Sequence, residues 1–172
     1  QTALLHAHLL ERGYDIRNIL FIDDYHPAPE ESTLDVDAYR GMAKTEGWPI
    51  DNVFFESQME KIGGVIIDTL RELGSALKFK EGMVLNRRRV HLLTPVEGDQ
   101  SCALLDAGLS IVKFALGTDG IINVVPRGLH GQQQNTRHIL RACLGHETLP
   151  FFNFFIDLQN GQSHAGRPHQ WT

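Results

Sequence analysis

Three aspartates follow short apolar segments of this chain. Asp23 and Asp24 come directly after residues 19–22, and Asp68 comes after residues 65–67. If each segment is a buried parallel strand, these carboxylates lie at the carboxyl edge of the sheet, where open α/β sheets bind ligands. A carboxylate there can hold Mg²⁺ through water, and another can orient an attacking water or a substrate hydroxyl.

The aspartates therefore have a chemical and a structural interpretation. The chemical one is that Asp23, Asp24 and Asp68 act on a bound ligand, by holding Mg²⁺ or by orienting a water or hydroxyl. The structural one is that a strand-end Asp caps the turn or helix that follows it.

The elements needed to position these residues follow from the apolar spacing. Helical spacing predicts helices over residues 2–12, 37–44, 101–116 and 136–144, and a capping pattern of Ser57 with Glu60 predicts a short helix there. Short apolar runs predict strands over residues 18–22, 53–55, 65–68, 90–96, 121–125 and 151–158. Strands that alternate with helices imply a mostly parallel sheet, in a three-layer α/β fold with helices on both faces.

The length of 172 residues fits one compact domain. We expect a single α/β domain over residues 1–158 and a polar, mobile tail over residues 159–172.

Charge and cysteine content narrow the class of protein. A net charge of −5 argues against a general polyanion-binding surface. The basic run Arg87, Arg88 and Arg89 is interpreted as a solvated turn, with a weak or indirect DNA contact as the alternative. Two cysteines, no apolar run long enough to span a bilayer and no signal peptide predict a cytoplasmic protein without a membrane span.

The order of these parts resembles the ParA/MinD-type P-loop ATPases. Residues 2–15 are similar to the helix after the Walker A loop of that family, and residues 19–23 resemble its second strand, which ends in an Asp. Residues 65–69 resemble its Walker B strand. Residues 90–96 resemble the next strand, and residues 121–127 resemble the strand near the nucleotide base. The resemblance covers about residues 1–128.

The resemblance implies an ATP-binding protein that uses Mg²⁺ and acts in plasmid partition, conjugative transfer or cell-division placement. It assigns Mg²⁺ to Asp68, places Asp23 near the attacking water, and places Asn123 and Arg127 at the base pocket. It also implies a homodimer with a regulatory protein partner. The Gly-rich loop with its Lys and Ser/Thr is absent from the 172 residues and is expected just before Gln1. ATPase activity depends on that loop.

Two other functions fit the same residues. A P-loop small-molecule kinase of the uridine- or pantothenate-kinase type is similar in having Asp-Asp followed by an aromatic, as in Asp23, Asp24 and Tyr25. There, one of the two aspartates would accept the proton of the substrate hydroxyl. A nucleotide-free interaction module that keeps only the fold is the second alternative, and the missing loop favours it.

Overall fold

The computed structural model describes residues 2–22, 24, 35–79, 82–86, 90–95, 100–145, 151–159 and 162–165. The chain divides into two compact units, Gln1–Ser57 and Gln58–Thr172. Each unit is described by itself below.

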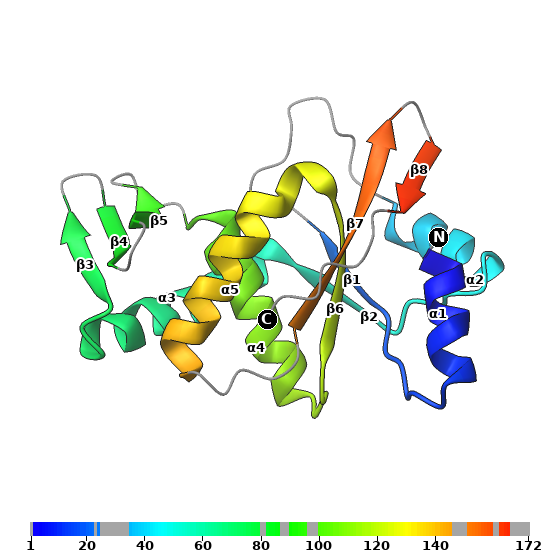
Figure 1. Ribbon diagram of the computed structural model, residues 1–172, viewed down its shortest axis with the longest axis horizontal. Coiled ribbons are helices and arrows are strands. Elements are labelled where there is room, and N and C mark those ends of the chain that lie inside the picture. Colours follow the sequence, from blue (N-terminus) through cyan, green and yellow to red (C-terminus); the bar gives the residue numbers. More distant parts are fainter. Residues whose placement is uncertain are drawn as a thin grey trace. The chain divides into compact units, whose positions relative to one another are not determined.

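The first unit is built around one pair of parallel strands. Its elements are α1 (Thr2–Glu11), β1 (Ile19–Ile22), α2 (Val36–Thr45) and β2 (Asn52–Phe55), shown in blue to cyan in Figure 1. β1 pairs in parallel with β2, with Ile19 opposite Asn52 and Ile22 opposite Phe55. These bounds confirm four predicted elements within one or two residues. They are the helices over residues 2–12 and 37–44 and the strands over residues 18–22 and 53–55.

Asn18 fixes the start of β1. Its backbone N–H donates to Oδ2 of Asp51 at 2.7 Å, and its side-chain amide donates to the carbonyl of Pro49 at 2.7 Å. The same amide lies 3.1 Å from Nδ1 of His6 in α1. One side chain thus joins α1, the start of β1 and the segment that leads into β2.

The predicted strand over residues 65–68 is wrong. These residues lie inside α3 (Glu56–Glu72), a helix of 17 residues. The run of Val65, Ile66 and Ile67 is β-branched and favours a strand locally. Helical spacing wins, because Met59, Ile66 and Leu70 fall on one face of α3 and are buried to 3% exposure or less.

Gly63 has a packing role within α3. The side-chain amide of Gln100 lies so close to it that a Cβ on Gly63 would overlap Oε1 of Gln100. Gln100 is itself buried and donates from Nε2 to the carbonyl of Glu60 at 2.7 Å. Gly63 therefore makes room for a side chain against the helix.

The predicted strand over residues 90–96 exists, but it does not join a parallel sheet. β5 (Val90–Pro95) pairs antiparallel with β4 (Gly82–Asn86), which pairs antiparallel with β3 (Ala76–Phe79). Short connections between these strands allow the meander, because antiparallel neighbours need only a tight turn whereas parallel ones need a long crossover. The basic run of Arg87, Arg88 and Arg89 lies outside the described residues.

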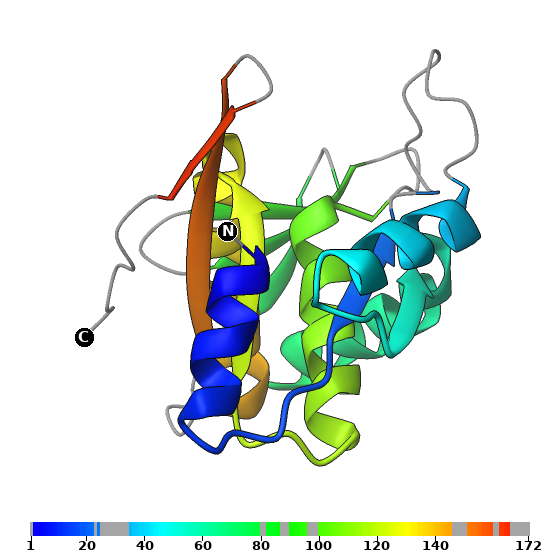
Figure 2. The same ribbon diagram turned by 90° about the vertical axis from the view of Figure 1, so that its right-hand side faces the viewer.

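The remainder of the second unit carries α4 (Cys102–Ala115), β6 (Ile121–Pro126), the short 3₁₀ helix η1 (Arg127–Leu129), α5 (His130–Leu144), β7 (Phe151–Gln159) and β8 (Gln162–Ala165). β6 and β7 run in parallel side by side (Figure 2), with Asn123 opposite Asn153. The predicted strands 121–125 and 151–158 and the helix 101–116 are confirmed. α5 begins six residues before the predicted helix 136–144.

Part of the predicted mobile tail is a strand. β7 extends to Gln159, and β8 pairs with it antiparallel, with Ile156 opposite Ala165. Residues 166–172 lie outside the described residues. The single domain expected over residues 1–158 stays a prediction.

The core of the second unit lies where α3, α4 and α5 meet β6 and β7. Leu70, Leu104 and Ile139 are exposed by 2% or less and belong to one apolar cluster with Ile121 and Phe151. α4 and α5 lie side by side in Figure 1. The opposite face of the strand pair is more open, since Ile122 is 42% and Phe152 45% exposed.

The expected α/β class is confirmed in its coarse form. Helices alternate with short strands, and parallel pairs occur in two small sheets, β1–β2 and β6–β7. The other described pairs are antiparallel, so the described sheets are mixed rather than mostly parallel. In the described part of the chain, no helix is both long enough and apolar enough to cross a bilayer.

Candidate functional site

Asp24 holds the start of α3. Its Oδ1 accepts the backbone N–H of Ser57 at 2.8 Å, and its Oδ2 accepts the Ser57 hydroxyl at 2.6 Å. A carboxylate on the first N–H groups of a helix satisfies unpaired donors and interacts favourably with the helix dipole. Asp24 therefore caps α3, 33 residues along the chain, and not the turn or helix directly after its own strand, as the structural interpretation expected. Asp23 lies outside the described residues.

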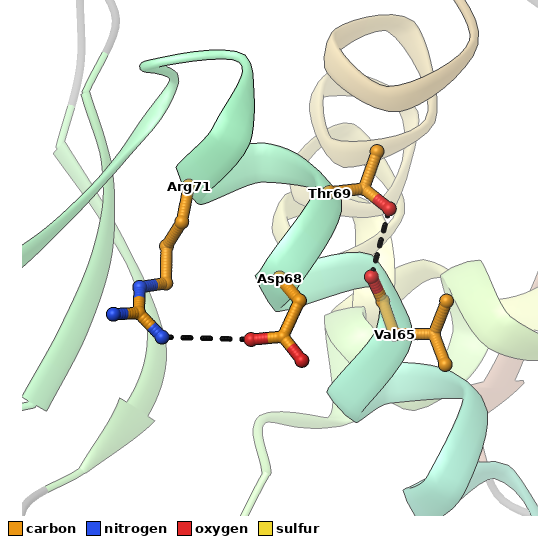
Figure 3. Close-up of polar contacts among 4 residues, drawn as sticks. All are labelled: Val65, Asp68, Thr69 and Arg71. Carbon is orange, nitrogen blue, oxygen red and sulfur yellow. Dashed lines mark hydrogen bonds and ion pairs between the residues drawn. The ribbon is translucent and has the colours of Figure 1, made fainter.

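Asp68 does not lie at a strand end. It projects from the middle of α3, as Figure 3 shows, and its side chain is 70% exposed. Arg71, one turn later, approaches Oδ1 of Asp68 at 3.5 Å. The neighbouring hydroxyl of Thr69 donates to the carbonyl of Val65 at 2.9 Å, as expected within a helix. The strand-edge argument for Mg²⁺ at Asp68 is thus wrong.

No group of three or more His, Cys, Asp or Glu side chains converges in the described part of the chain. Asp68 is not part of such a group, and one oxygen of its carboxylate already contacts Arg71.

Asn123 lies in a network of polar side chains inside the second unit. Its Nδ2 donates to Oε1 of Gln133 at 3.2 Å and to Oδ1 of Asn153 at 3.4 Å, and its Oδ1 accepts from Nζ of Lys113 at 3.1 Å. Asn153 and Gln133 are buried. Both donor positions of the Asn123 amide are therefore used within the protein, which suits a positioning role better than direct contact with a base.

Asp106 of α4 is the charged centre of this network. Its Oδ2 accepts from the side-chain amides of Gln132 and Gln133, each at 2.8 Å. Burial raises the pKa of the Asp106 carboxyl, while the two amides and the charge of Lys113 act in the opposite direction. The four elements α4, β6, α5 and β7 are thus joined by polar contacts as well as by the apolar core.

Lys113 is the cation of the network. It lies seven residues after Asp106, two turns along the same face of α4. Burial lowers the pKa of its ammonium group to about 8, although the charge of Asp106 raises it. A lysine with such a pKa is partly neutral near physiological pH and can accept or release a proton there.

Arg127 marks the carboxyl end of β6. It is exposed, directly follows Pro126 and opens η1, which leads into the first turn of α5. A guanidinium beside the N-terminal end of a 15-residue helix is suited to an anionic ligand, because the helix dipole and the arginine both favour negative charge. His130, at the start of α5, packs edge-on against the ring of Phe155 with centroids 5.1 Å apart.

The structure therefore brings together only some of the predicted residues. Asn123 and Arg127 lie on the same strand-to-helix segment, whereas Asp68 lies on a helix surface. Sequence reasoning missed Asp106, Lys113 and Gln133. The signal that points to them is a pair of opposite charges seven residues apart on the face of a largely apolar helix, which is costly to bury unless paired.

The thiol of Cys143 shows no sign of reactivity. Burial raises its pKa to about 11, so the nucleophilic thiolate is scarce at neutral pH.

Comparison with known proteins identifies a fold but no family. No family model matches the chain, and no curated protein matches it. A solved structure from Campylobacter jejuni, provisionally named an arginyl-tRNA synthetase, is similar over 96% of this chain with a TM-score of 0.55 and 12% sequence identity. The chain spans 45% of the length of that structure. At this identity, the likeness shows a shared fold.

Proposed function

We propose that this chain binds ATP, and that its nucleotide site lies at the carboxyl end of β6. The observation that carries the proposal is the segment from Asn123 to His130, in which a parallel strand delivers Arg127 to the N-terminal end of α5. Ligands of open α/β folds bind at such strand ends, and helix N-termini favour phosphate.

The residues have distinct roles in this proposal. Arg127 contacts the nucleotide phosphates, and the first N–H groups of α5 add hydrogen-bond donors. Asn123 does not contact the nucleotide in this proposal. It positions the end of β6, because its contacts with Gln133 and Asn153 fix β6 against α5 and β7. Lys113 and Asp106 hold Asn123 in turn. No step is assigned to Mg²⁺, since no cluster of three or more His, Cys, Asp or Glu side chains occurs among the described residues.

The use made of ATP has two candidate answers. The resemblance to ParA/MinD-type ATPases implies partition, conjugative transfer or division placement, with a homodimer and a regulatory partner. That resemblance needed a Walker B strand at residues 65–68, where the chain forms α3. The fold likeness to a protein named as an arginyl-tRNA synthetase instead supports ATP-dependent chemistry on tRNA. The second rests on the name of that protein, because at 12% identity the likeness itself shows a shared fold.

The nucleotide site is tested by measuring the binding of radiolabelled ATP in equilibrium dialysis. We expect Arg127→Gln to weaken ATP binding about tenfold, the loss typical of one charge-assisted contact. Arg71→Gln is the matched control, because it removes an exposed arginine of the same unit far along the sequence. Asp68→Ala is expected to leave ATP binding unchanged.

ATP consumption distinguishes the proposed uses. Stimulation by arginine and tRNA together supports the synthetase-like use, while consumption that responds to neither supports the ATPase use. Phosphorylation of uridine or pantothenate would instead support the kinase. A protein that binds no ATP, or whose ATP affinity is equal with and without Arg127, overturns the proposal and leaves the nucleotide-free interaction module.

A further inference from the structure

The first turn of α5 is open to solvent where Arg127 precedes it. Arg127, Gly128 and Gly131 are all exposed. A Cβ added at Gly128 or at Gly131 would meet no described atom within 4 Å, so there is space beside the backbone at both positions. An anion in solution can therefore reach the Arg127 guanidinium and the first N–H groups of α5.

A carboxylate is held against the same turn from α4. Oδ2 of Asp106 accepts from Nε2 of Gln132, the third residue of α5, at 2.8 Å. Nε2 of Gln133, the fourth residue, donates to the same oxygen at 2.8 Å. One turn further along, the hydroxyl of Thr136 donates to the carbonyl of Ala103 at 3.2 Å. These contacts fix the carboxylate of Asp106 relative to the start of α5.

Bond lengths limit the distance between Asp106 and an anion at this turn. Nε2 of a glutamine lies no more than about 6 Å from the backbone N of the same residue, since each bond is near 1.5 Å. Oδ2 of Asp106 is 2.8 Å from Nε2 of Gln132. An anion that accepts the N–H of Gln132 therefore lies within about 12 Å of the carboxylate, when about 3 Å is added for the hydrogen bond.

At that distance an ionised Asp106 opposes the binding of an anion. Two unit charges about 12 Å apart, with an effective dielectric constant near 20, repel each other enough to change an affinity about tenfold. Asp106 is half-buried, and burial raises the pKa of its carboxyl, against the effects of Gln132, Lys113 and Gln133. A second negative charge nearby would raise that pKa further. Protonation of Asp106 and binding of the anion therefore favour each other, because the linkage is reciprocal.

We propose that Asp106 sets the affinity of the nucleotide site through its charge, so that the site takes up its anion together with one proton from solvent. This inference rests on the proposed function, because the anion is the phosphate of the nucleotide that Arg127 contacts. It makes Asp106 a residue that controls affinity without touching the nucleotide. The affinity for ATP then rises as pH falls through the pKa of Asp106, which is raised above its model value of 3.8.

Two other ionisable groups near Asp106 have to be separated from it. Lys113 lies on the same helix, and its pKa of about 8 means that it already carries its proton below about pH 7. His130 opens α5 and can also gain a proton on acidification. From β6 and β7 the network presents the uncharged amides of Asn123 and Asn153.

Asp106→Asn tests the effect of the charge. Asparagine keeps an acceptor oxygen for the glutamine amides and cannot ionise. ATP binding is measured by equilibrium dialysis at fixed ionic strength, from about pH 7 down to about pH 4.5. We expect the variant to bind ATP about tenfold more tightly than the wild type at about pH 7. That ratio should shrink toward one as pH falls. ATP and His130 titrate in both proteins, so the ratio isolates Asp106.

Two further variants serve as controls. Asp68→Asn removes an exposed carboxylate of the same unit and should give a ratio near one at every pH. His130→Asn keeps Asp106 and removes the other group that takes up a proton, so its ATP affinity should still rise on acidification. This variant tests the proposal even if thermal unfolding shows that Asp106→Asn is not folded. Without proton uptake by Asp106, its affinity should fall instead, because the phosphates of ATP themselves lose charge.

The outcomes separate this inference from the proposed function. Equal ATP affinities of the wild type and folded Asp106→Asn at about pH 7 overturn this inference alone, provided that ATP binding depends on Arg127. A ratio that stays constant with pH also overturns it, because the substitution then acts through structure and not through charge. An ATP affinity of His130→Asn that falls on acidification does the same. A wild type that binds no ATP, or that binds it as well with Arg127→Gln, overturns the proposed function and this inference with it.

Discussion

Lys113 on α4 donates a hydrogen bond from Nζ to Oδ1 of Asn123 on β6 at 3.1 Å, which joins a charged helix side chain to the centre of a parallel strand pair. The side-chain amide of Asn123 in turn donates hydrogen bonds to Asn153 on β7 and to Gln133 on α5. Because each partner is buried or half-buried, loss of one leaves others without a hydrogen bond. Stability measurements can therefore test the network independently of any ligand.

Removal of Asp106 is expected to destabilise the protein strongly. Asp106→Ala leaves Lys113 without its counter-charge and the amides of Gln132 and Gln133 without their acceptor. We expect a loss of about 3 kcal/mol in the free energy of unfolding, measured with urea. Asp119→Ala, at an exposed position, should change it by less than about 0.5 kcal/mol. Equal effects of the two substitutions would contradict the network.

Lys113 should also make stability depend on pH. Its pKa is 10.5 as a model value and about 8 in the folded protein, so the unfolded chain binds more protons between these values. The free energy of unfolding attributable to Lys113 therefore rises as pH rises from about 8 to about 10.5. Below that window, the lysine reduces stability by the cost of burying its charge.

Comparison of the wild type with Lys113→Met isolates this effect. The difference in free energy of unfolding, wild type minus variant, should increase across the window in urea titrations at fixed ionic strength. Lys61→Met on the exposed side of α3 is the control and should give a flat difference. A flat difference for Lys113 as well would show that the lysine is not buried as described.

The contact between Asp24 and Ser57 should contribute to stability as a pair. Asp24→Ala and Ser57→Ala each remove a capping interaction at the start of α3 and should cost about 1 kcal/mol. The double variant should cost less than the sum of the two, because both substitutions break the same contact. Strict additivity in urea unfolding would mean that the Ser57 hydroxyl does not contact Asp24.

Two adjacent glycines of α3 should respond in opposite directions. Gly64→Ala should stabilise the protein by up to about 1 kcal/mol, because nothing lies near the added methyl group and alanine favours the helix. Gly63→Ala should destabilise it, since the methyl group would displace Gln100 from a buried position. Thermal unfolding of both variants measures this, and stabilisation by both would contradict the packing of Gln100 on α3.

Most elements could be predicted from the sequence, because their patterns are local. The helices at residues 2–12 and 101–116 follow from apolar spacing, and Ser101 caps the second by accepting the N–H of Leu104. The strands at residues 18–22, 121–125 and 151–158 follow from short apolar runs bounded by polar residues. The six added residues of α5 could not be read in this way, since Gly131 and three glutamines carry no apolar period.

The site could be predicted only in part, because it depends on which elements meet. The sequence by itself determined that Asn123 lies in a strand and that Arg127 comes directly after the end of that strand. Only the tertiary structure decided that Val65, Ile66 and Ile67 belong to a helix, since Ile66 and Leu70 gain more by burial on one face than the β-branched run gains as a strand. It likewise decided that Lys113 on α4 meets Asn123 on β6, because a contact between two elements leaves no trace in local spacing.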